Sequence, residues 1–236
     1  IQGRATAKIA VLFPTLTYIT YANFHDLSDG LWDPDRIPNA NSGLHLEQYD
    51  YIMQNDMTSL YDKHSDGSGT CYSSRLRPIL NMRPKHRYRI WNAPARFAAD
   101  LYMIDWLDAK GYKADVITDE DIHNEGISLL TNYKVVITGS HPEYWTSQML
   151  DALDGYLESG GRLMYLGGNG FYGVLTVDPK RPYFVELRRW GGSWPFELPS
   201  GERYHNITGQ PGGIWRNRGV PPQQLVGVGS CSAGFD

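Results

Sequence analysis

Apolar and polar positions follow a regular order along residues 134–173, which predict a complete strand, helix, strand unit. Lys134–Thr138 (KVVIT) is a short β-branched apolar run, typical of a strand buried on both faces. A helix should begin after Thr146, which can cap its first turn, and end at Gly160, because apolar side chains recur there at three- and four-residue steps. Arg162–Leu166 then predicts the next parallel strand, since a unit of this length closes as a right-handed crossover.

The segments before this unit extend the same alternation. Lys8–Phe13 predicts a first strand, ended by a proline. Ala95–Lys110 predicts a helix with one apolar stripe, and Ala114–Thr118 predicts a second strand. Asp119–Tyr133, acidic at its start, predicts an irregular helix. The order of these elements indicates an α/β fold with a doubly wound, mostly parallel sheet.

Two regions lack this periodicity. Thr15–Asn92 has little helical period and many Gly, Pro, Asn and aromatic residues, so we expect an ordered insertion that folds over the carboxyl edge of the sheet. After Gly173 the pattern weakens: Pro182–Trp190 predicts a strand or a short helix, and Trp194–Pro222 predicts aromatic-anchored loops or short antiparallel strands. We expect a single domain over residues 1–236, as a fragment of a longer chain.

Composition narrows the possible partners. The 236 residues carry a net charge of -4 with a pI of about 6.0, so no general basic field points to nucleic acid, and we expect no such partner. No apolar run approaches the roughly 20 residues that cross a bilayer, which predicts no membrane association and a cytoplasmic location. Cys71 and Cys231 are too few for a disulfide framework or a zinc site, and two reduced thiols are expected.

Polar side chains follow two neighbouring predicted strands. His141, Glu143 and Tyr144 come after the first strand, and Asn169 comes after the next. In open α/β sheets ligands bind at the carboxyl edge, so these side chains should face one crevice. A histidine and a carboxylate can ligate a metal or move protons. The alternative is a polar loop that only caps the following helix.

The loop GGNG, residues 167–170, bears on the type of chemistry. Hydrolases with a nucleophile elbow place Ser or Cys at the centre of such a turn, whereas the centre here is Asn169. An amide is not a nucleophile, so a covalent acyl-enzyme route is disfavoured. Asn169 fits two roles equally well: it orients a carbonyl or a water, or it is a turn residue that tolerates unusual backbone angles. For Tyr21 and Tyr61, their spacing in the sequence alone gives no reason to single them out from the other 14 tyrosines as functional residues.

Several segments, in order and over nearly the whole chain, together resemble the large subunit of the N,N-dimethylformamidase family. They are PTLTYITYANF, SLYDKHSDGSGTCYSSRLRPILNMRP, GSHPEYWT, LGGNGFYG and GGIWRNRGVPPQQLVGVG. The resemblance implies a mononuclear Fe(III) centre held by Tyr21, Tyr61 and Glu143, with Tyr18 as an alternative to Tyr21. It also implies catalytic roles for His141 and Asn169, on a sheet similar to that of class I glutamine amidotransferases but without their cysteine.

The resemblance implies an amidohydrolase that splits the C–N bond of small N-substituted amides, above all N,N-dimethylformamide, into an amine and an acid. It further implies a small partner subunit and self-association into a hetero-oligomer. Two alternatives stay open. One is a noncatalytic amidotransferase-like domain that binds a ligand or partner, and the other is the same hydrolase chemistry on a different amide.

Overall fold

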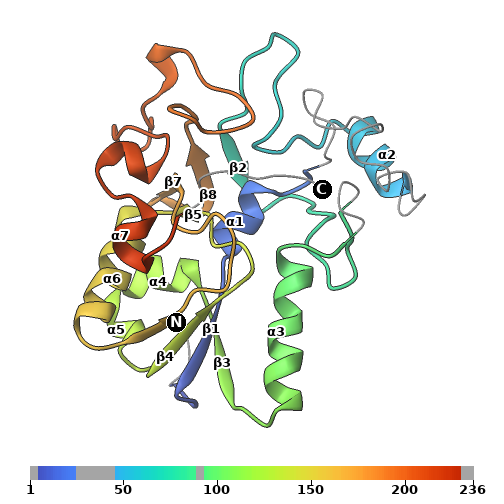
Figure 1. Ribbon diagram of the computed structural model, residues 1–236. Helices are drawn as coiled ribbons and strands as arrows, with labels where there is room; N and C mark the ends of the chain where they lie inside the picture. Colours follow the sequence, from blue (N-terminus) through green and yellow to red (C-terminus); the bar gives the residue numbers. More distant parts are fainter. Residues whose placement is uncertain (1–4, 25–45, 89–92, 230–236) are drawn as a thin grey trace.

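Four parallel strands form the sheet on which the rest of the protein is built (Figure 1). Their order is β3–β1–β4–β6, with β1 (Ile9–Phe13) and β4 (Val135–Thr138) at the centre and β3 (Ala114–Thr118) and β6 (Arg162–Met164) at the edges. The pairing is in register over each strand, and Leu12 lies opposite Thr138. All four predicted strands are confirmed, each to within two residues at its ends.

The coordinates are a computed structural model, which describes residues 5–24, 46–88 and 93–229. No helix in these ranges is both long and apolar enough to cross a membrane. Beside the four strands, the elements are α1 (Thr15–Thr20), α2 (Leu46–Gln54), β2 (Tyr72–Ser74), α3 (Phe97–Ala109), α4 (Asp119–Glu125), α5 (Ile127–Leu130), β5 (Tyr144–Trp145), α6 (Ser147–Glu158), β7 (Gly173–Asp178), β8 (Arg181–Leu187), η2 (Ser200–Glu202), η3 (Trp215–Arg218) and α7 (Pro222–Val226).

Helices cover both faces of the parallel sheet, as the doubly wound pattern predicts. Along β1, Ala10 and Leu12 join the larger core cluster, under α4, α5 and α6. Val11 and Phe13 point the other way and join a smaller cluster with Leu107 of α3. Figure 1 shows α3 alone on its side of the sheet and the other three helices opposite. Successive side chains of a strand point to opposite faces of the sheet. A strand that is covered on both faces therefore needs apolar residues at every position.

Two predicted helices differ from expectation in ways the backbone explains. The helix predicted from Ala95 begins at Phe97 instead, because Arg96 has a φ of 56° and a ψ of -129°, outside the helical region. The irregular helix predicted over Asp119–Tyr133 is two short helices, α4 and α5, separated by Gly126 at a φ of 64°. Thr146 caps α6 as predicted, accepting a hydrogen bond from the Met149 N–H at 3.3 Å.

The predicted insertion, Thr15–Asn92, is not free of helices. It contains α1, α2 and β2, and α1 begins only two residues after β1 ends. The first residue of α1 follows Pro14, which makes no side-chain cap. Asp119, buried and distant in sequence, supplies the cap: its carboxylate accepts from the Leu16 N–H at 3.0 Å and from the Thr15 hydroxyl at 2.7 Å. A helix capped from over 100 residues away leaves no local signal in the sequence.

A second, mixed sheet of order β2–β8–β7–β5 lies beside the first. β5 and β7 are parallel, whereas β8 is antiparallel to both β7 and β2. For Pro182–Trp190, the strand alternative is confirmed by β8, but β7 was not predicted. The expectation of one mostly parallel sheet is therefore correct only for β1, β3, β4 and β6. The pairing of β2 with β8 joins segments more than 100 residues apart, which local periodicity cannot reveal.

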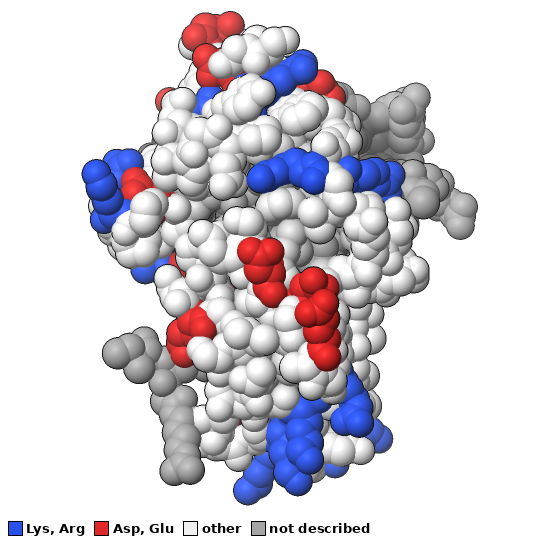
Figure 2. Space-filling model, turned by 90° about the vertical axis from the view of Figure 1, so that its left-hand side faces the viewer, with Lys and Arg blue, Asp and Glu red and all other residues white. Residues whose placement is uncertain are grey.

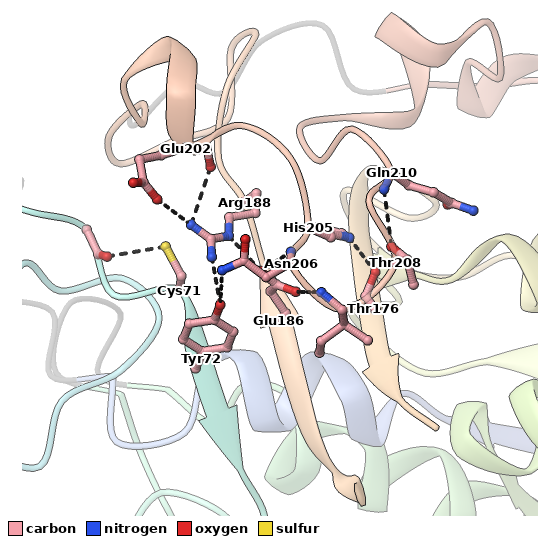
Figure 3. A network of polar contacts seen from close by, with 12 residues as sticks. Cys71, Tyr72, Thr176, Glu186, Arg188, Glu202, His205, Asn206, Thr208 and Gln210 are labelled. Carbon is pink, nitrogen blue, oxygen red and sulfur yellow. Dashed lines mark hydrogen bonds and ion pairs between the residues drawn. The ribbon is translucent and has the colours of Figure 1, made fainter. Parts of the chain in front are cut away.

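A buried polar network fixes the loop after β8 onto this second sheet (Figure 3). Arg188 bonds Glu186 and Glu202, each at 2.7 Å, and donates to the Tyr72 hydroxyl at 2.7 Å. The fully buried Glu186 also accepts the Asn206 N–H at 2.8 Å and a further backbone N–H. Every charge in the interior of this network thus has a partner, which is the condition for burying it.

The face on the α6 side of the molecule carries charges of both signs (Figure 2). Acidic side chains gather near its middle, while Lys and Arg lie mainly at its lower end and in a band above the acidic group.

Replacing Asp119 by Ala should destabilise the protein by about 1–3 kcal/mol, because the buried Leu16 N–H at the start of α1 loses its acceptor. Urea unfolding followed by circular dichroism measures the change. Asp154→Ala, which removes an exposed carboxylate on α6, is the matched control and should change the free energy of unfolding by less than about 0.5 kcal/mol. Equal effects of the two substitutions would refute the capping role.

His205 should make the protein less stable in mild acid. Burial lowers the pKa of this imidazole to about 4, although Glu186 acts in the opposite direction. Between a usual pKa of about 6.5 and a pKa of about 4, the unfolded chain binds a proton that the folded one does not. Stability should therefore fall by on the order of 3 kcal/mol as the pH drops from 6.5 to 4. Urea unfolding at several pH values should show this slope, and His205→Gln should flatten it.

Candidate metal centre at the sheet edge

Two loops meet at the carboxyl edge of the parallel sheet, one after β4 and one after β6. Their backbones are joined directly: the Gly168 N–H donates to the Ser140 carbonyl at 3.0 Å, and the Phe171 N–H donates to the Pro142 carbonyl at 2.9 Å. The Glu143 carbonyl accepts two more N–H groups, that of Tyr172 at the end of the second loop at 3.0 Å and that of Gly173 at the start of β7 at 2.9 Å. The predicted meeting of the two loops is confirmed, and it holds the backbone of Glu143 in place.

The Glu143 carboxylate is the centre of the site. It is only 5% exposed, and its Oε2 accepts the Tyr21 hydroxyl at 2.6 Å and contacts His141 Nε2 at 2.8 Å. Burial opposes ionisation of this carboxyl, but His141, Tyr21 and Arg189 outweigh it and hold its pKa below the usual range. Glu143 is therefore a buried anion at neutral pH.

Two phenols complete the cluster. Tyr21 directly follows α1, and its ring stacks on that of Tyr61 with 4.4 Å between centroids and 24° between planes. The Tyr61 hydroxyl lies 2.6 Å from the Tyr144 hydroxyl, which also accepts from Arg189 at 3.2 Å. Burial, followed by the negative charge of Glu143, raises the pKa of Tyr21 and of Tyr61 well above the usual value. Both phenols are thus neutral unless a cation replaces their protons.

Neighbouring amides fix the backbone of the tyrosines. The Asn81 side chain donates to the Tyr21 carbonyl at 2.7 Å, and its Oδ1 accepts the Asn23 N–H at 3.1 Å. The Tyr61 N–H donates to the Ser59 hydroxyl at 2.9 Å within a tight turn. Both tyrosines lie in Thr15–Asn92, so this segment brings two of the predicted ligands to the edge of the sheet.

Tyr18 lies elsewhere, although it is only three residues before Tyr21. Its ring packs in the smaller cluster on the α3 side of the sheet, and its hydroxyl donates to Asp100. The contact with Glu143 is therefore made by Tyr21. Tyr18 lies within α1, whereas Tyr21 comes directly after the helix, so the two tyrosines are not held by the same regular backbone.

Asn169 occupies the tip of the second loop, exposed and with a φ of 49°. This left-handed backbone matches its predicted alternative role as a turn residue. The loop also passes close to His141: a Cβ atom on Gly168 would lie 3.8 Å from His141 Nδ1. Beside His141 opens a pocket of about 340 Å³, lined by Ala93, Pro94, Ala95, Arg96, Ala99, Ser140 and His141.

The donor chemistry fits a hard cation. No group of three or more His, Cys, Asp or Glu side chains placed to hold a metal occurs within residues 5–24, 46–88 and 93–229. The cluster instead offers oxygen: one ionised carboxylate and two phenols, of which Tyr21 already lies 2.6 Å from Glu143. Oxygen donors of this kind suit hard metal ions such as Fe(III). Cys71, by contrast, is a free, buried thiol in a separate small cluster with Phe196 and Leu198.

Fold and site together define an α/β protein with a buried carboxylate–phenol cluster at the carboxyl edge of its parallel sheet. A sequence profile described as "N,N-dimethylformamidase beta subunit-like, C-terminal" matches residues 2–236. The chain therefore belongs to the N,N-dimethylformamidase beta subunit family, and the resemblance predicted from its motifs is confirmed.

Two relatives show the same kinship over the whole chain. The N,N-dimethylformamidase beta subunit of Paracoccus aminophilus is 42% identical over 243 residues, and that of Alcaligenes sp is 42% identical over 244 residues. In each case the match covers 100% of this chain but 31% of the relative. This chain thus spans about a third of the length of these relatives.

The sequence did not indicate two residues that shape the site. Arg96 lies with its guanidinium carbon 3.4 Å from the ring centroid of Tyr21, and Arg189 lies 4.2 Å from that of Tyr61. Arg96 comes from the start of α3 and Arg189 from the segment after β8. Neither belongs to a recognisable motif, because the two arginines reach the tyrosines from segments that meet only in the folded protein.

Proposed function

We propose that this chain carries the metal centre of an iron-dependent hydrolase that cleaves the C–N bond of small N-substituted amides. N,N-dimethylformamide, split into dimethylamine and formate, is the favoured substrate, because the relatives are subunits named for that amide. The observation that carries the proposal is the buried contact between Tyr21 and Glu143, with Tyr61 stacked beside it. A core related to that of class I glutamine amidotransferases is part of the same proposal.

Tyr21, Tyr61 and Glu143 would hold a mononuclear Fe(III), with the two phenols ionised and the cluster closed to bulk water by its burial. A ferric ion held there would act as a Lewis acid toward water and the amide carbonyl. Tyr144 positions Tyr61, since their hydroxyls lie 2.6 Å apart. No protein nucleophile is required, which agrees with an asparagine at the centre of GGNG.

His141 would move the proton that amide cleavage requires. With Nε2 bonded to Glu143, the ring presents Nδ1 to accept a proton from the attacking water. The same nitrogen then gives that proton to the departing amine, so the amine leaves neutral and His141 returns to its starting form. Asn169, in the loop that passes close to His141, would orient the carbonyl or the water.

The neighbouring pocket favours a second candidate substrate class. Its volume of about 340 Å³ exceeds what an amide with five heavy atoms fills, and its alanines and proline form an apolar wall. Larger N-substituted amides would therefore fit the same chemistry. We further propose that the protein acts with a smaller partner subunit in a hetero-oligomer, because the relatives are named beta subunits. The cytoplasmic location stays a prediction.

Tyr21→Phe, Tyr61→Phe and Glu143→Gln should each abolish iron binding and amide cleavage while leaving the fold intact, because each removes one anionic oxygen. The complete gene product, purified with any partner subunit, is analysed for iron content, visible absorption and dimethylamine release. Tyr18→Phe is the matched control: it removes a buried tyrosine hydroxyl three residues from Tyr21 and should keep both iron and activity.

Iron near one equivalent per chain, with a visible band lost in the three variants, supports the proposal. Iron retained by all three variants would show that the ligands lie elsewhere. A colourless protein that does not take up added iron would favour the noncatalytic binding domain. A protein that binds iron and cleaves a larger amide but does not cleave N,N-dimethylformamide would favour the second substrate class.

A further inference from the structure

Two arginines enclose the pair of stacked tyrosines. The guanidinium carbon of Arg96 lies 3.4 Å from the ring centroid of Tyr21, and that of Arg189 lies 4.2 Å from the ring centroid of Tyr61. The tyrosine rings stack at 4.4 Å, so each ring already has its partner on one face. At these distances a guanidinium fits only on the opposite face. The result is a stack of four layers, with a cation outside each phenol.

These arginines are deeply buried. Arg189 is 1% exposed and Arg96 is 6% exposed. The negatively charged Glu143 lies beside the same tyrosines, since its carboxylate accepts the Tyr21 hydroxyl at 2.6 Å. Arg189 donates to oxygens that carry no full charge, at 3.3 Å to the Leu60 carbonyl and at 3.2 Å to the Tyr144 hydroxyl. Each guanidinium therefore brings a full positive charge to the face of a tyrosine ring in the protein interior, where charges interact more strongly than in water.

The backbone at Arg96 is a second, independent observation. Its φ of 56° is in the left-handed region, where a residue with a Cβ is strained by about 1–3 kcal/mol. Strain of this kind concentrates at functional sites, where the surrounding structure maintains it. Its consequence is visible in the fold, because α3 begins only at Phe97 and the side chain of Arg96 reaches the face of Tyr21.

We propose that Arg96 and Arg189 are positioning residues of the metal centre: fixed cations that hold the two phenol rings in place and stabilise the negative charge of the rings as ligands. This role rests on the proposed function, since it concerns how Tyr21 and Tyr61 bind Fe(III). A guanidinium keeps its charge at all accessible pH values, and its plane matches an aromatic face. A lysine would supply the charge without the plane.

The test replaces each arginine by Gln, which removes the charge, and by Lys, which keeps it. Without the cation, electrons on a phenolate are less stabilised, so their transfer to iron on absorbing light needs less energy. The Gln variants should therefore show a visible band at longer wavelength and a 10- to 100-fold weaker iron affinity, and the Lys variants should lie between Gln and wild type. Iron titration of the complete gene product, followed by visible absorption, measures both.

Arg218→Gln is the matched control, because Arg218 also stacks on an aromatic ring, 4.6 Å from Trp215, but outside the site. This variant should leave the visible band and the iron affinity unchanged.

If Arg189→Gln fails to fold, Arg189→Met takes its place in the test, because methionine keeps the apolar stem of the side chain and removes the charge.

Two results would overturn the positioning role of the arginines. One is a visible band and an iron affinity that do not change in the Gln or Met variants. The other is weaker iron binding in variants whose remaining bound iron absorbs at the wild-type wavelength. Wild-type protein that binds no iron would overturn the proposed function first, so the two failures are distinguishable.

Discussion

The contact between the Tyr21 hydroxyl and Glu143 is the constraint on which the site depends. The two residues are 122 positions apart in the sequence, and their oxygens lie 2.6 Å apart in the folded protein. The contact therefore forms only when the segment after α1 packs against the loop after β4. Glu143 is held by the loop after β6, whose N–H groups bond its carbonyl, and Tyr21 is held by Asn81 and by the helix that Asp119 caps. The parallel sheet thus positions the carboxylate, and the segment between β1 and α3 positions the phenols.

Burial gives this cluster its electrostatic character. A carboxylate removed from water stays ionised only if its neighbours compensate, and His141, Tyr21 and Arg189 do so for Glu143. The phenols have the opposite tendency, because burial and the nearby anion keep their protons bound. Under the proposed function, the site would exchange these protons for a cation, and the two arginines would stabilise the negative charge of the phenolates that result.

The parallel sheet and the meeting of its two loops could be predicted, because β-branched runs, glycine stops and a threonine cap are local signals. His141 and Glu143 were predicted to share a crevice for the same reason. Tyr21 and Tyr61 could be singled out only through a family resemblance, since spacing did not separate them from other tyrosines. Asp119, Arg96 and the pairing of β2 with β8 act across long sequence separations, so no local pattern indicated them.

The central claim is that Tyr21, Tyr61 and Glu143 bind one ferric ion. Anomalous diffraction at the iron absorption edge, from crystals of the complete gene product, tests it most directly. The account predicts a single strong peak within bonding distance, about 2 Å, of the two phenol oxygens and the carboxylate. A peak bound by other side chains, or crystals of catalytically active protein without any iron peak, would contradict it.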